Sequence, residues 1–433
     1  MVRLGVVVAS MGATGGAQIP PRRVVLQPAG ARTGYGADLA DGVAVPRHAR
    51  SVRIEREGEV IRRAPDGNAP RRGTAGRGAR LPALEATQGA GCRGVWVRVE
   101  VEAWVCSDDA PMSSEAPVGE AMPRMREGEV VPFQYAFATH AGVRTYRRLE
   151  DVAEDNWAEE LERGMSVAVT GTDRTQGSTY VHTASGRWVS MRDLSWARPS
   201  ERTGIFYDPG AAPEGVGFLR ANTRAWPTAE SALRGNAPPR STTALAHRDG
   251  VQIREEATLR GRRLVRVDAG WIPAAALLRP TAPPFPPDLG PTERWVDVDR
   301  AAQILVAYQG RTPVFAALVS TGRAGAQTAA GEHRVWVKLA TTDMSNVNDM
   351  ALESATALYT VARVPWVMFF HQDQALHAAF WHDGFGRARS HGCVNLAPRD
   401  ARWLYEWAPP QLPPGWSGAF PTPTEPGMRV RVR

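Results

Sequence analysis

The sequence predicts a mainly β protein built from several consecutive units. Between residues 88 and 280, short runs of alternating apolar and polar residues are separated by Gly, Pro and Asp, as in strands joined by tight turns. The same alternation returns between residues 295 and 370. A chain of 433 residues is long enough for about three domains of roughly 150 residues. We therefore expect separate β units with only short helices.

The first 80 residues differ in composition from the rest. Residues 1–17 combine Met1 and Arg3 with a short apolar run and small residues, the outline of a signal peptide. Residues 18–80 contain thirteen arginines, six acidic residues and few aromatics, which predicts disorder because little apolar surface could be buried. This excess of seven charges equals the net charge of the chain, so the remainder is nearly neutral. Without a zinc-finger spacing or a basic–aromatic motif, the charge does not indicate nucleic-acid binding.

The β region of residues 88–280 contains a loose repeat, in which a tryptophan is followed a few residues later by leucine. It recurs at residues 186–194 and 270–278, and Trp96 and Trp104 mark an earlier copy. These segments resemble the end of bacterial SH3-like modules. The resemblance implies one such β-barrel region at 88–200 and a second at 201–280, acting as binding modules or as spacers. Inside the first, the composition of residues 150–163 predicts a short helix.

Two of the three cysteines lie in the first of these regions. Cys92 and Cys106 flank a strand-like run at residues 95–101, so a hairpin would bring them together. A disulfide beside one free thiol suits an oxidising compartment of the cell envelope. Two small buried apolar side chains are the alternative.

The last third of the chain begins after a proline-rich linker at residues 281–292. Pro398 can begin a helix that Pro409 ends, and residues 410–433 read as a proline-rich tail. The alternating runs predict strands at residues 295–299, 303–308, 313–320, 333–338 and 361–370.

The third cysteine belongs to the segment Ser390–Leu396, which reads SHGCVNL. A cysteine is a strong nucleophile only as a thiolate, so Cys393 needs a base or a positive field nearby. His377 lies sixteen residues upstream and would supply that base, giving a Cys–His pair suited to acyl transfer. Gly392 allows a sharp turn, so that backbone amides can converge on a developing oxyanion.

These residues resemble the catalytic motif of the L,D-transpeptidases, bacterial cell-wall enzymes with a cysteine nucleophile. The resemblance covers residues 293–409 and departs from the family pattern at Thr328–Gly331, which lacks the usual proline. It implies a β-sandwich with a short helix after the nucleophile loop. It also implies a thioester acyl-enzyme formed on peptidoglycan tetrapeptide stems, which then forms a 3→3 cross-link or acylates another amine. No cofactor and no metal are implied.

The resemblance also assigns roles around this pair. His377 is the base, His391 has a supporting role, and the carbonyl of Ala378 would hold the imidazole tautomer. Other residues would shape the loop and the oxyanion hole, namely Ser390, Asn395 and the amides of Gly392 and Cys393.

Three neighbouring residues are candidates for substrate binding. Trp381 and Phe380 would line the groove or pack in the core, and Arg389 would bind a peptide carboxylate or remain an exposed charge. A zinc site would instead use His382 together with both motif histidines and the cysteine, but that spacing fits no common zinc pattern.

The expected setting is the periplasm or another part of the cell envelope, for a secreted protein. No run of eighteen apolar residues appears, so no integral membrane segment is expected. The partners implied are a peptidoglycan donor stem and an amine acceptor. Two other functions remain open: a carboxypeptidase or hydrolase that passes the same acyl group to water, and a non-catalytic wall-binding protein that works through its SH3-like regions.

Overall fold

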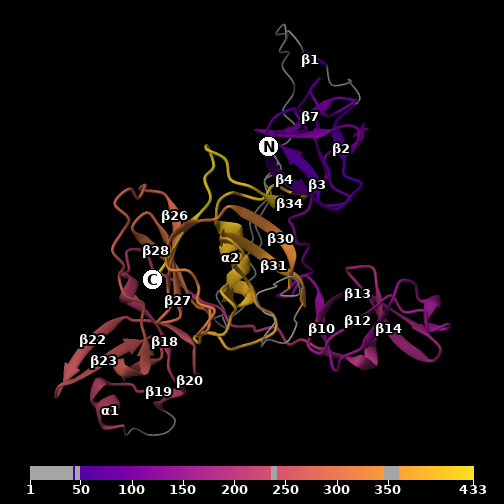
Figure 1. Cartoon of the computed structure of the whole chain (residues 1–433). Coiled ribbons are helices and arrows are strands. Elements are labelled where there is room, and N and C mark those ends of the chain that lie inside the picture. Colours follow the sequence, from indigo (N-terminus) through magenta and orange to yellow (C-terminus); the bar gives the residue numbers. More distant parts are fainter. Residues whose placement is uncertain (1–41, 44–48, 236–240, 346–359) are drawn as a thin grey trace, which may run out of the picture. The chain divides into compact units, whose positions relative to one another are not determined.

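The computed structural model describes residues 42–43, 49–235, 241–345 and 360–433 (Figure 1). The chain separates into a unit of residues 1–40 and a unit of residues 41–433, and every described element belongs to the second. The signal-peptide prediction for residues 1–17 lies outside the described residues. In the described part the protein is mainly β, as the sequence predicted, and no helix there is long and apolar enough to cross a membrane.

The largest sheet joins the N-terminal part of the described chain to its C-terminal third. Its strands are antiparallel except for the last pair, β32 and β33, which run parallel. In order, the strands are β1 (Gly42–Val43), β6 (Glu85–Thr87), β7 (Trp96–Glu100), β8 (Ala103–Cys106), β3 (Glu59–Arg62), β4 (Arg71–Ala75), β34 (Trp416–Ala419), β30 (Val337–Ser345), β31 (Thr360–His371), β32 (Gln374–Ala378) and β33 (Val394–Leu396).

A second sheet of the C-terminal third contains most of the remaining strands predicted there. The strand β35 near the C-terminus runs parallel to its neighbour β26, with Val296 opposite Val430. In order, the strands are β17 (Ile205–Phe206), β28 (Thr312–Leu318), β27 (Ile304–Gln309), β26 (Arg294–Asp299), β35 (Arg429–Val432) and β29 (Gly331–Arg334).

The helix α2 (Pro398–Trp407) packs into the core shared by these two sheets (Figure 1). Leu404 of the helix is fully buried in one cluster with Phe315 of β28 and Leu376 of β32. Lys338, the only lysine of the chain, is buried on β30 and its Nζ donates to the carbonyls of Tyr405 (2.6 Å) and Ala408 (2.8 Å). A cation at the C-terminal end of a helix satisfies carbonyls that lack a helical partner, so Lys338 ties the helix to the sheet.

A seven-stranded sheet occupies residues 134–196. It packs on β31 through Tyr135, whose ring stacks on Phe380 with centroids 3.6 Å apart. In order, its strands are β12 (Glu159–Leu161), β11 (Val143–Tyr146), β15 (Trp188–Ser190), β14 (Ser178–Thr183), β13 (Ser166–Thr175), β10 (Gln134–Ala138) and β16 (Leu194–Trp196).

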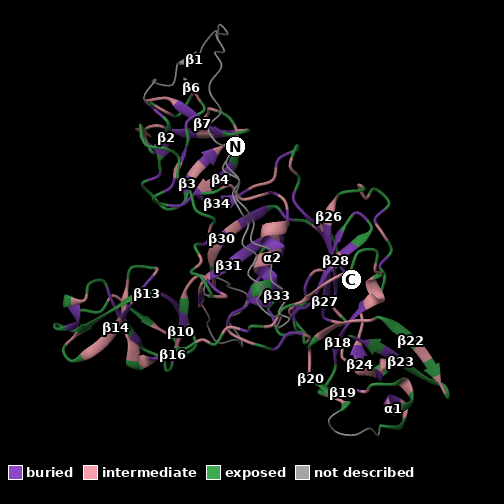
Figure 2. Ribbon diagram, turned by 180° about the vertical axis from the view of Figure 1, so that it is seen from behind, coloured by how far each residue is buried: buried purple, intermediate pink, exposed green. Residues whose placement is uncertain are grey.

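Smaller sheets and short helices complete the described chain. Figure 2 shows the contrast in burial, with β26 almost wholly buried and β22 without a buried residue. The small sheets are β5 (Arg80–Pro82), β2 (Ser51–Arg53) and β9 (Met112–Ser113); β21 (Gly250–Gln252), β18 (Val216–Leu219) and β25 (Leu277–Leu278); β19 (Thr223–Ala225) and β20 (Thr243–Leu245); and β22 (Glu255–Leu259), β23 (Arg262–Val267) and β24 (Gly270–Pro273). The helices besides α2 are α1 (Ala229–Arg234) and the 3₁₀ turns η1 (Glu150–Val152), η2 (Met191–Asp193), η3 (Pro213–Gly215) and η5 (Ala274–Ala276). The SH3-like character of residues 88–280 stays a prediction.

Part of the predicted disordered segment is ordered. Residues 49–80 include β2, β3 and β4, and their apolar side chains Val52, Ile54 and Ile61 are buried in one cluster. Some arginines of residues 49–80 are held by acceptors; buried Arg72, for example, pairs with Glu425 at 2.8 Å. The disorder prediction is therefore wrong for residues 49–80, because apolar residues spaced along short strands suffice for a core.

Two further predictions from composition are also wrong. Residues 150–163 form only the single turn η1 and the strand β12, because residues 159–161 pair with β11 and strand pairing overrides helix propensity. Residues 410–433 are not a tail, because β34 belongs to the largest sheet and β35 to the second sheet described above. The prolines there lie outside these two strands.

Cys92 and Cys106 are joined by a disulfide, with Cα atoms 5.7 Å apart. Cys106 ends β8 and lies opposite Trp96 of β7, so the bond closes the hairpin that the sequence suggested. Cys393 is the free cysteine.

Candidate active site

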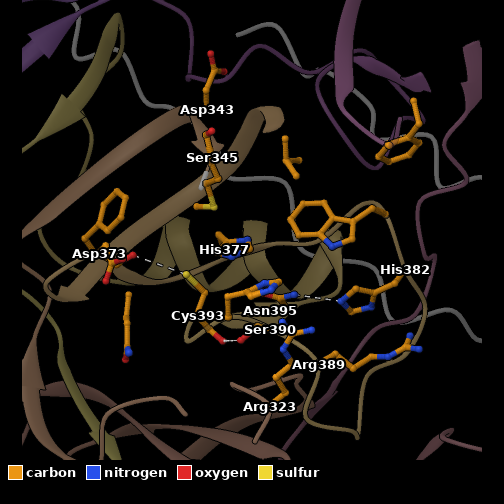
Figure 3. A pocket seen from close by; sticks show the side chains of 18 of the residues that line it. Arg323, Asp343, Ser345, Asp373, His377, His382, Arg389, Ser390, Cys393 and Asn395 are labelled. Carbon is orange, nitrogen blue, oxygen red and sulfur yellow. Dashed lines mark hydrogen bonds between the residues drawn. The ribbon is translucent and has the colours of Figure 1, made fainter. Parts of the chain in front are cut away.

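The parallel pair β32 and β33 sets the geometry of the site. His377 of β32 lies opposite Asn395 of β33, and Cys393 lies two residues before Asn395. Residues two apart on a strand share a face, so the three side chains point to the same side of the sheet. All three line one cavity (Figure 3). The structure thus brings together the cysteine and histidine that the sequence proposed as a catalytic pair.

The loop before Cys393 is fixed by local hydrogen bonds. Gly392 has φ +130°, and a Cβ there would meet Gln374 Nε2 at 2.9 Å, so glycine is required on two grounds. The Ser390 hydroxyl accepts from the Gly392 amide (3.1 Å) and donates to the Cys393 carbonyl (2.5 Å). Ser390 therefore shapes the nucleophile turn, the role expected from the sequence.

A second loop supports this turn from the side. The Thr328 hydroxyl is buried, donates to the Gly392 carbonyl (2.7 Å) and accepts from the Gly322 amide (2.9 Å). The Ala329 amide donates to Gln374 Oε1 at 2.8 Å. The loop at Thr328 that lacks the family proline is thus held by hydrogen bonds to the active-site strands.

The tautomer of His377 follows from its surroundings. Its Nδ1 lies 3.0 Å from the carbonyl of Ala378, and because a carbonyl only accepts, Nδ1 carries the proton. Nε2 of the neutral ring is then a free base. Burial lowers the pKa of His377 to about 4, although the hydrogen bond to Ala378 opposes this. The ring, 2% exposed, also stacks on Trp381 with centroids 5.7 Å apart.

The thiol of Cys393 is not ionised in the free protein. Its desolvation raises the pKa to about 11, and the Ala375 amide, which donates to Sγ at 3.4 Å, only partly offsets this. The thiol itself donates to the carbonyl of Asp373 at 3.8 Å (Figure 3). Burial disfavours the charged form of both groups, so the neutral thiol and the neutral imidazole are favoured in the free protein.

The cavity beside the thiol has a volume of about 800 Å³. Arg389 and Trp381, two of the candidates for substrate binding, line it. Phe380 does not: it is fully buried and stacks on Tyr135, so the core-packing alternative is correct for this residue. Other predicted site residues at the wall are His391, Ser390 and Asn395, while Ala378 is buried in the strand.

Several residues at the site had no recognised role in the sequence. Asp373 ends the turn before β32 and accepts from the Cys393 thiol, and Gln374, the first residue of β32, accepts from the Ala329 amide, yet no motif marks either residue. Arg323 lines the cavity near His391. Burial of the His391 ring lowers its pKa below the ordinary value, and the positive charge of Arg323 lowers it further. Phe137 and Arg163 come from the seven-stranded region and complete the wall. Their presence depends on packing between distant segments, which sequence spacing cannot indicate.

The zinc alternative is not supported by the geometry. In the described part of the chain, His377, His382, His391 and Cys393 do not bring three ligand atoms within 4.8 Å of one another. The one group that does is formed by Asp108 with the two cysteines of the disulfide, whose sulfurs are already bonded to each other.

Comparison with known proteins gives a family for this part of the chain. Residues 293–432 match the family model described as the L,D-transpeptidase catalytic domain, whereas no curated protein matches the chain.

Solved structures with some likeness include three L,D-transpeptidases. An Enterococcus faecium enzyme is 18% identical over 33% of this chain and 50% of its own, with a TM-score of 0.25. One from Mycobacterium smegmatis is 15% identical over 62% of this chain and 99% of its own, with a TM-score of 0.26. The ertapenem-acylated catalytic domain from E. faecium is 20% identical over 33% of this chain and 97% of its own, with a TM-score of 0.25.

This chain thus covers half the length of the first of these proteins, and likeness at such TM-scores carries no argument about function. The family match includes the nucleophile turn, both strands of the Cys393–His377 pair and the supporting helix. Residues 293–432 are therefore an L,D-transpeptidase catalytic domain.

Proposed function

We propose that this protein is an L,D-transpeptidase of the cell envelope that uses Cys393 as nucleophile. One observation carries the proposal: a neutral imidazole with a free Nε2 and a thiol share one sheet face, at the wall of an open cavity, inside the matched domain. A base in this state can take the thiol proton only as the sulfur attacks, which is general-base catalysis.

The first half-reaction would acylate the enzyme. Nε2 of His377 takes the proton of Cys393 as Sγ attacks the carbonyl carbon after the L-centre of diaminopimelate in a tetrapeptide stem. The Sγ–C bond forms, the carbonyl becomes an oxyanion, and its collapse breaks the C–N bond to D-alanine. The protonated His377 returns its proton to the leaving amine, so that D-alanine departs neutral at nitrogen.

The second half-reaction would transfer the acyl group. An amine of a second stem attacks the thioester, His377 removes a proton from it, and the C–S bond breaks. His377 returns this proton to Sγ, which restores the thiol, and the product is a 3→3 cross-link or another acylated amine. If water is the acceptor, the same steps give a carboxypeptidase. No step requires a cofactor.

The proposed oxyanion hole has one backbone donor, where the sequence suggested two. The Gly392 amide already donates to Ser390 Oγ. The Cys393 amide is therefore the donor assigned to the oxyanion in this proposal. Ser390 and Asn395 remain residues that shape the loop and its strand.

The setting proposed is extracytoplasmic, because the polymer on which such a domain acts lies there. The Cys92–Cys106 disulfide fits an oxidising compartment. The partners proposed are the peptidoglycan donor stem and an amine acceptor. Arg389 and Trp381, at the cavity wall, are the proposed contacts for the donor peptide.

The test uses the full chain and the intact mass after exposure to meropenem. Wild-type protein should gain one meropenem mass, and Cys393→Ala should gain none. A second assay supplies tetrapeptide stems and identifies the products. Release of D-alanine with formation of a dimer supports transfer, and release without dimers identifies the carboxypeptidase. An adduct on Cys393→Ala contradicts the proposal. So does wild-type protein that binds sacculi but leaves the stems unchanged, and this second result identifies a wall-binding protein.

A further inference from the structure

His382 lies at the cavity wall, and the mechanism above gives it no role. It is half-buried, and both ring nitrogens have partners: Nδ1 lies 3.1 Å from the Gly384 amide, and Nε2 lies 3.1 Å from the side-chain amide of Asn395 (Figure 3). Because a backbone N–H only donates, Nδ1 of His382 must be the acceptor. The proton of the neutral ring is then on Nε2, which makes Nε2 a donor toward Asn395.

This tautomer fixes the orientation of the Asn395 amide. As placed, Nδ2 of Asn395 faces the Nε2–H of His382, donor against donor, while Oδ1 is buried without a hydrogen-bond partner in the described part of the protein. A half-turn of the amide removes the conflict, since Oδ1 then accepts from Nε2–H and Nδ2 takes the buried position that Oδ1 leaves. Side-chain amide oxygen and nitrogen are distinguished only by such partners. His382 therefore holds Asn395 with its oxygen toward the ring.

Asn395 is well placed to pass this constraint to the reacting groups. It lies opposite His377 across the parallel strands and two residues after Cys393, on the same face as both. Its backbone is also fixed, because Asn395 and Ser320 exchange two main-chain hydrogen bonds of 2.9 Å. Among the described residues, His382 is the hydrogen-bond partner of the side-chain amide.

The loop that carries His382 is anchored by the upstream part of the chain. The Asp383 carboxylate accepts from the Ser200 hydroxyl at 2.5 Å and from Arg202 Nε at 3.0 Å. The Asp383 carbonyl accepts from Arg248 Nη1 at 2.6 Å. Burial would raise the pKa of Asp383, but the hydrogen bonds from Ser200 and Arg202 outweigh it, so the pKa is lowered and the group stays ionised.

From these contacts we infer that His382 is a positioning residue for the active site, which orients Asn395 beside the Cys393–His377 pair, and that Ser200, Arg202 and Arg248 hold His382 in place through Asp383. The upstream β region is thereby part of the machinery for turnover and not only a spacer. The inference rests on the proposed function.

The charges around His382 favour the neutral ring that this role needs. Burial lowers its pKa to about 4, the cations of Arg389 and Arg248 lower it further, and Asp383 opposes them. At neutral pH the ring therefore keeps one donor and one acceptor, which its two partners require.

The tautomers can be read directly by nitrogen NMR of the full chain with ¹⁵N-labelled histidine. His377 should carry its proton on Nδ1 and His382 on Nε2, so the two rings should show opposite tautomers. The signals are assigned by their loss in His377→Gln and His382→Gln. The same tautomer on both rings, or a doubly protonated His382 at neutral pH, overturns the inference. This measurement does not depend on turnover, so it stays informative even if the proposed function fails.

The functional test measures the acylation of Cys393 by meropenem as a function of meropenem concentration. His382→Phe should lower the maximal acylation rate roughly tenfold to hundredfold, with the half-saturating concentration little changed, because a buried acceptor loses its donor. His382→Gln keeps an N–H donor near the Nε2 position and should recover most of the rate. The matched control His140→Phe changes an exposed histidine far along the chain and should leave the rate unchanged. A wild-type rate in His382→Phe, or no recovery in His382→Gln, overturns the inference.

The anchor is tested with Arg202→Ala and Arg248→Ala, separately and combined. Each should lower the maximal acylation rate, and the double variant should approach His382→Phe. Arg254→Ala is the control, because Arg254 pairs with Asp268 and Asp208 and touches no residue of the active site. A double variant that acylates like wild type overturns the role of the anchor. If Cys393→Ala still forms the adduct, the proposed function fails, and this outcome is distinct from every result above.

Discussion

Two β regions that precede the catalytic domain are attached to it by different means: the strands of residues 51–113 and the seven-stranded sheet of residues 134–196. Residues 71–75 form β4, which pairs with β34, and β34 pairs in turn with β30, so that attachment is made by the main chain. The seven-stranded region is attached mainly by side chains: the Tyr135 ring stacks on Phe380, and its hydroxyl donates to the Arg363 carbonyl at 2.8 Å. The first attachment needs two backbones to approach closely, and the second needs one large ring.

Each attachment depends on a different kind of residue at its critical position. At β4 the critical position is Gly73, because a Cβ there would lie 2.4 Å from the Trp416 ring and 2.5 Å from the Gly418 carbonyl. At β10 the critical position is Tyr135, which is 2% exposed and fills the space against Phe380. One attachment thus fails by adding atoms and the other by removing them.

The largest effect is expected from Tyr135→Ala. Loss of a buried aromatic ring costs about 3–5 kcal/mol of folding free energy, and the cavity would open beside Phe380, whose neighbour Trp381 lines the active site. Thermal unfolding of the full chain should show a clearly lower midpoint, and meropenem acylation should slow. The control Tyr180→Ala removes a less buried ring of the same sheet. If both variants lose equal stability, the side-chain attachment is not specific to Tyr135.

A smaller effect is expected from Gly73→Ala, which adds one methyl group at the main-chain attachment. Overpacking of this kind costs about 1–3 kcal/mol, because Trp416 and the Gly418 carbonyl must move. The matched control is Gly171→Ala in β13, where a Cβ would meet nothing within 4 Å. The unfolding midpoint of Gly73→Ala should therefore be lower than that of Gly171→Ala. Equal midpoints would show that β4 and β34 can separate without loss of stability.

A still smaller effect is expected from Tyr135→Phe, which keeps the ring and removes only the hydroxyl. The lost hydrogen bond to the Arg363 carbonyl contributes about 0.5–1.5 kcal/mol. The unfolding midpoint should therefore fall much less than in Tyr135→Ala. A loss as large as that of Tyr135→Ala would place the attachment in the hydrogen bond instead of the stacked ring.

The sequence predicted the site better than the regions that support it. The segment Ser390–Leu396 and its distance from His377 identified the pair, and regular alternation located β26, β27, β28 and β31, because both depend on local spacing. The predicted strand at residues 333–338 is instead divided between β29 and β30, which belong to different sheets. The strands of residues 49–80 were missed because their arginines outweighed a few well-spaced apolar residues.

Long-range contacts explain the other omissions. Strand β34 pairs with β4 across more than 300 residues of sequence, and Arg72 donates to the Phe420 carbonyl. The sequence offered His382 only as a ligand in the zinc alternative, and its contacts with Gly384 and Asn395 reveal its orientation. For Cys393, spacing indicates which groups meet but not how much water remains around them.

The smallest expected effect is that of pH on acylation of wild-type protein, which depends on the Cys393–His377 pair. The pKa of His377 is about 4 and that of Cys393 about 11, so between roughly pH 5 and 10 the base is unprotonated and the thiol is neutral. The maximal rate of meropenem acylation should therefore be nearly flat from pH 6 to 9, falling only as acid protonates His377. A preformed thiolate–imidazolium pair would instead lose activity when its imidazolium deprotonates. In His377→Gln the thiol has no base, so its much slower acylation should rise about tenfold per pH unit with the thiolate fraction. A wild-type rate that rises as steeply would show that His377 does not take the proton.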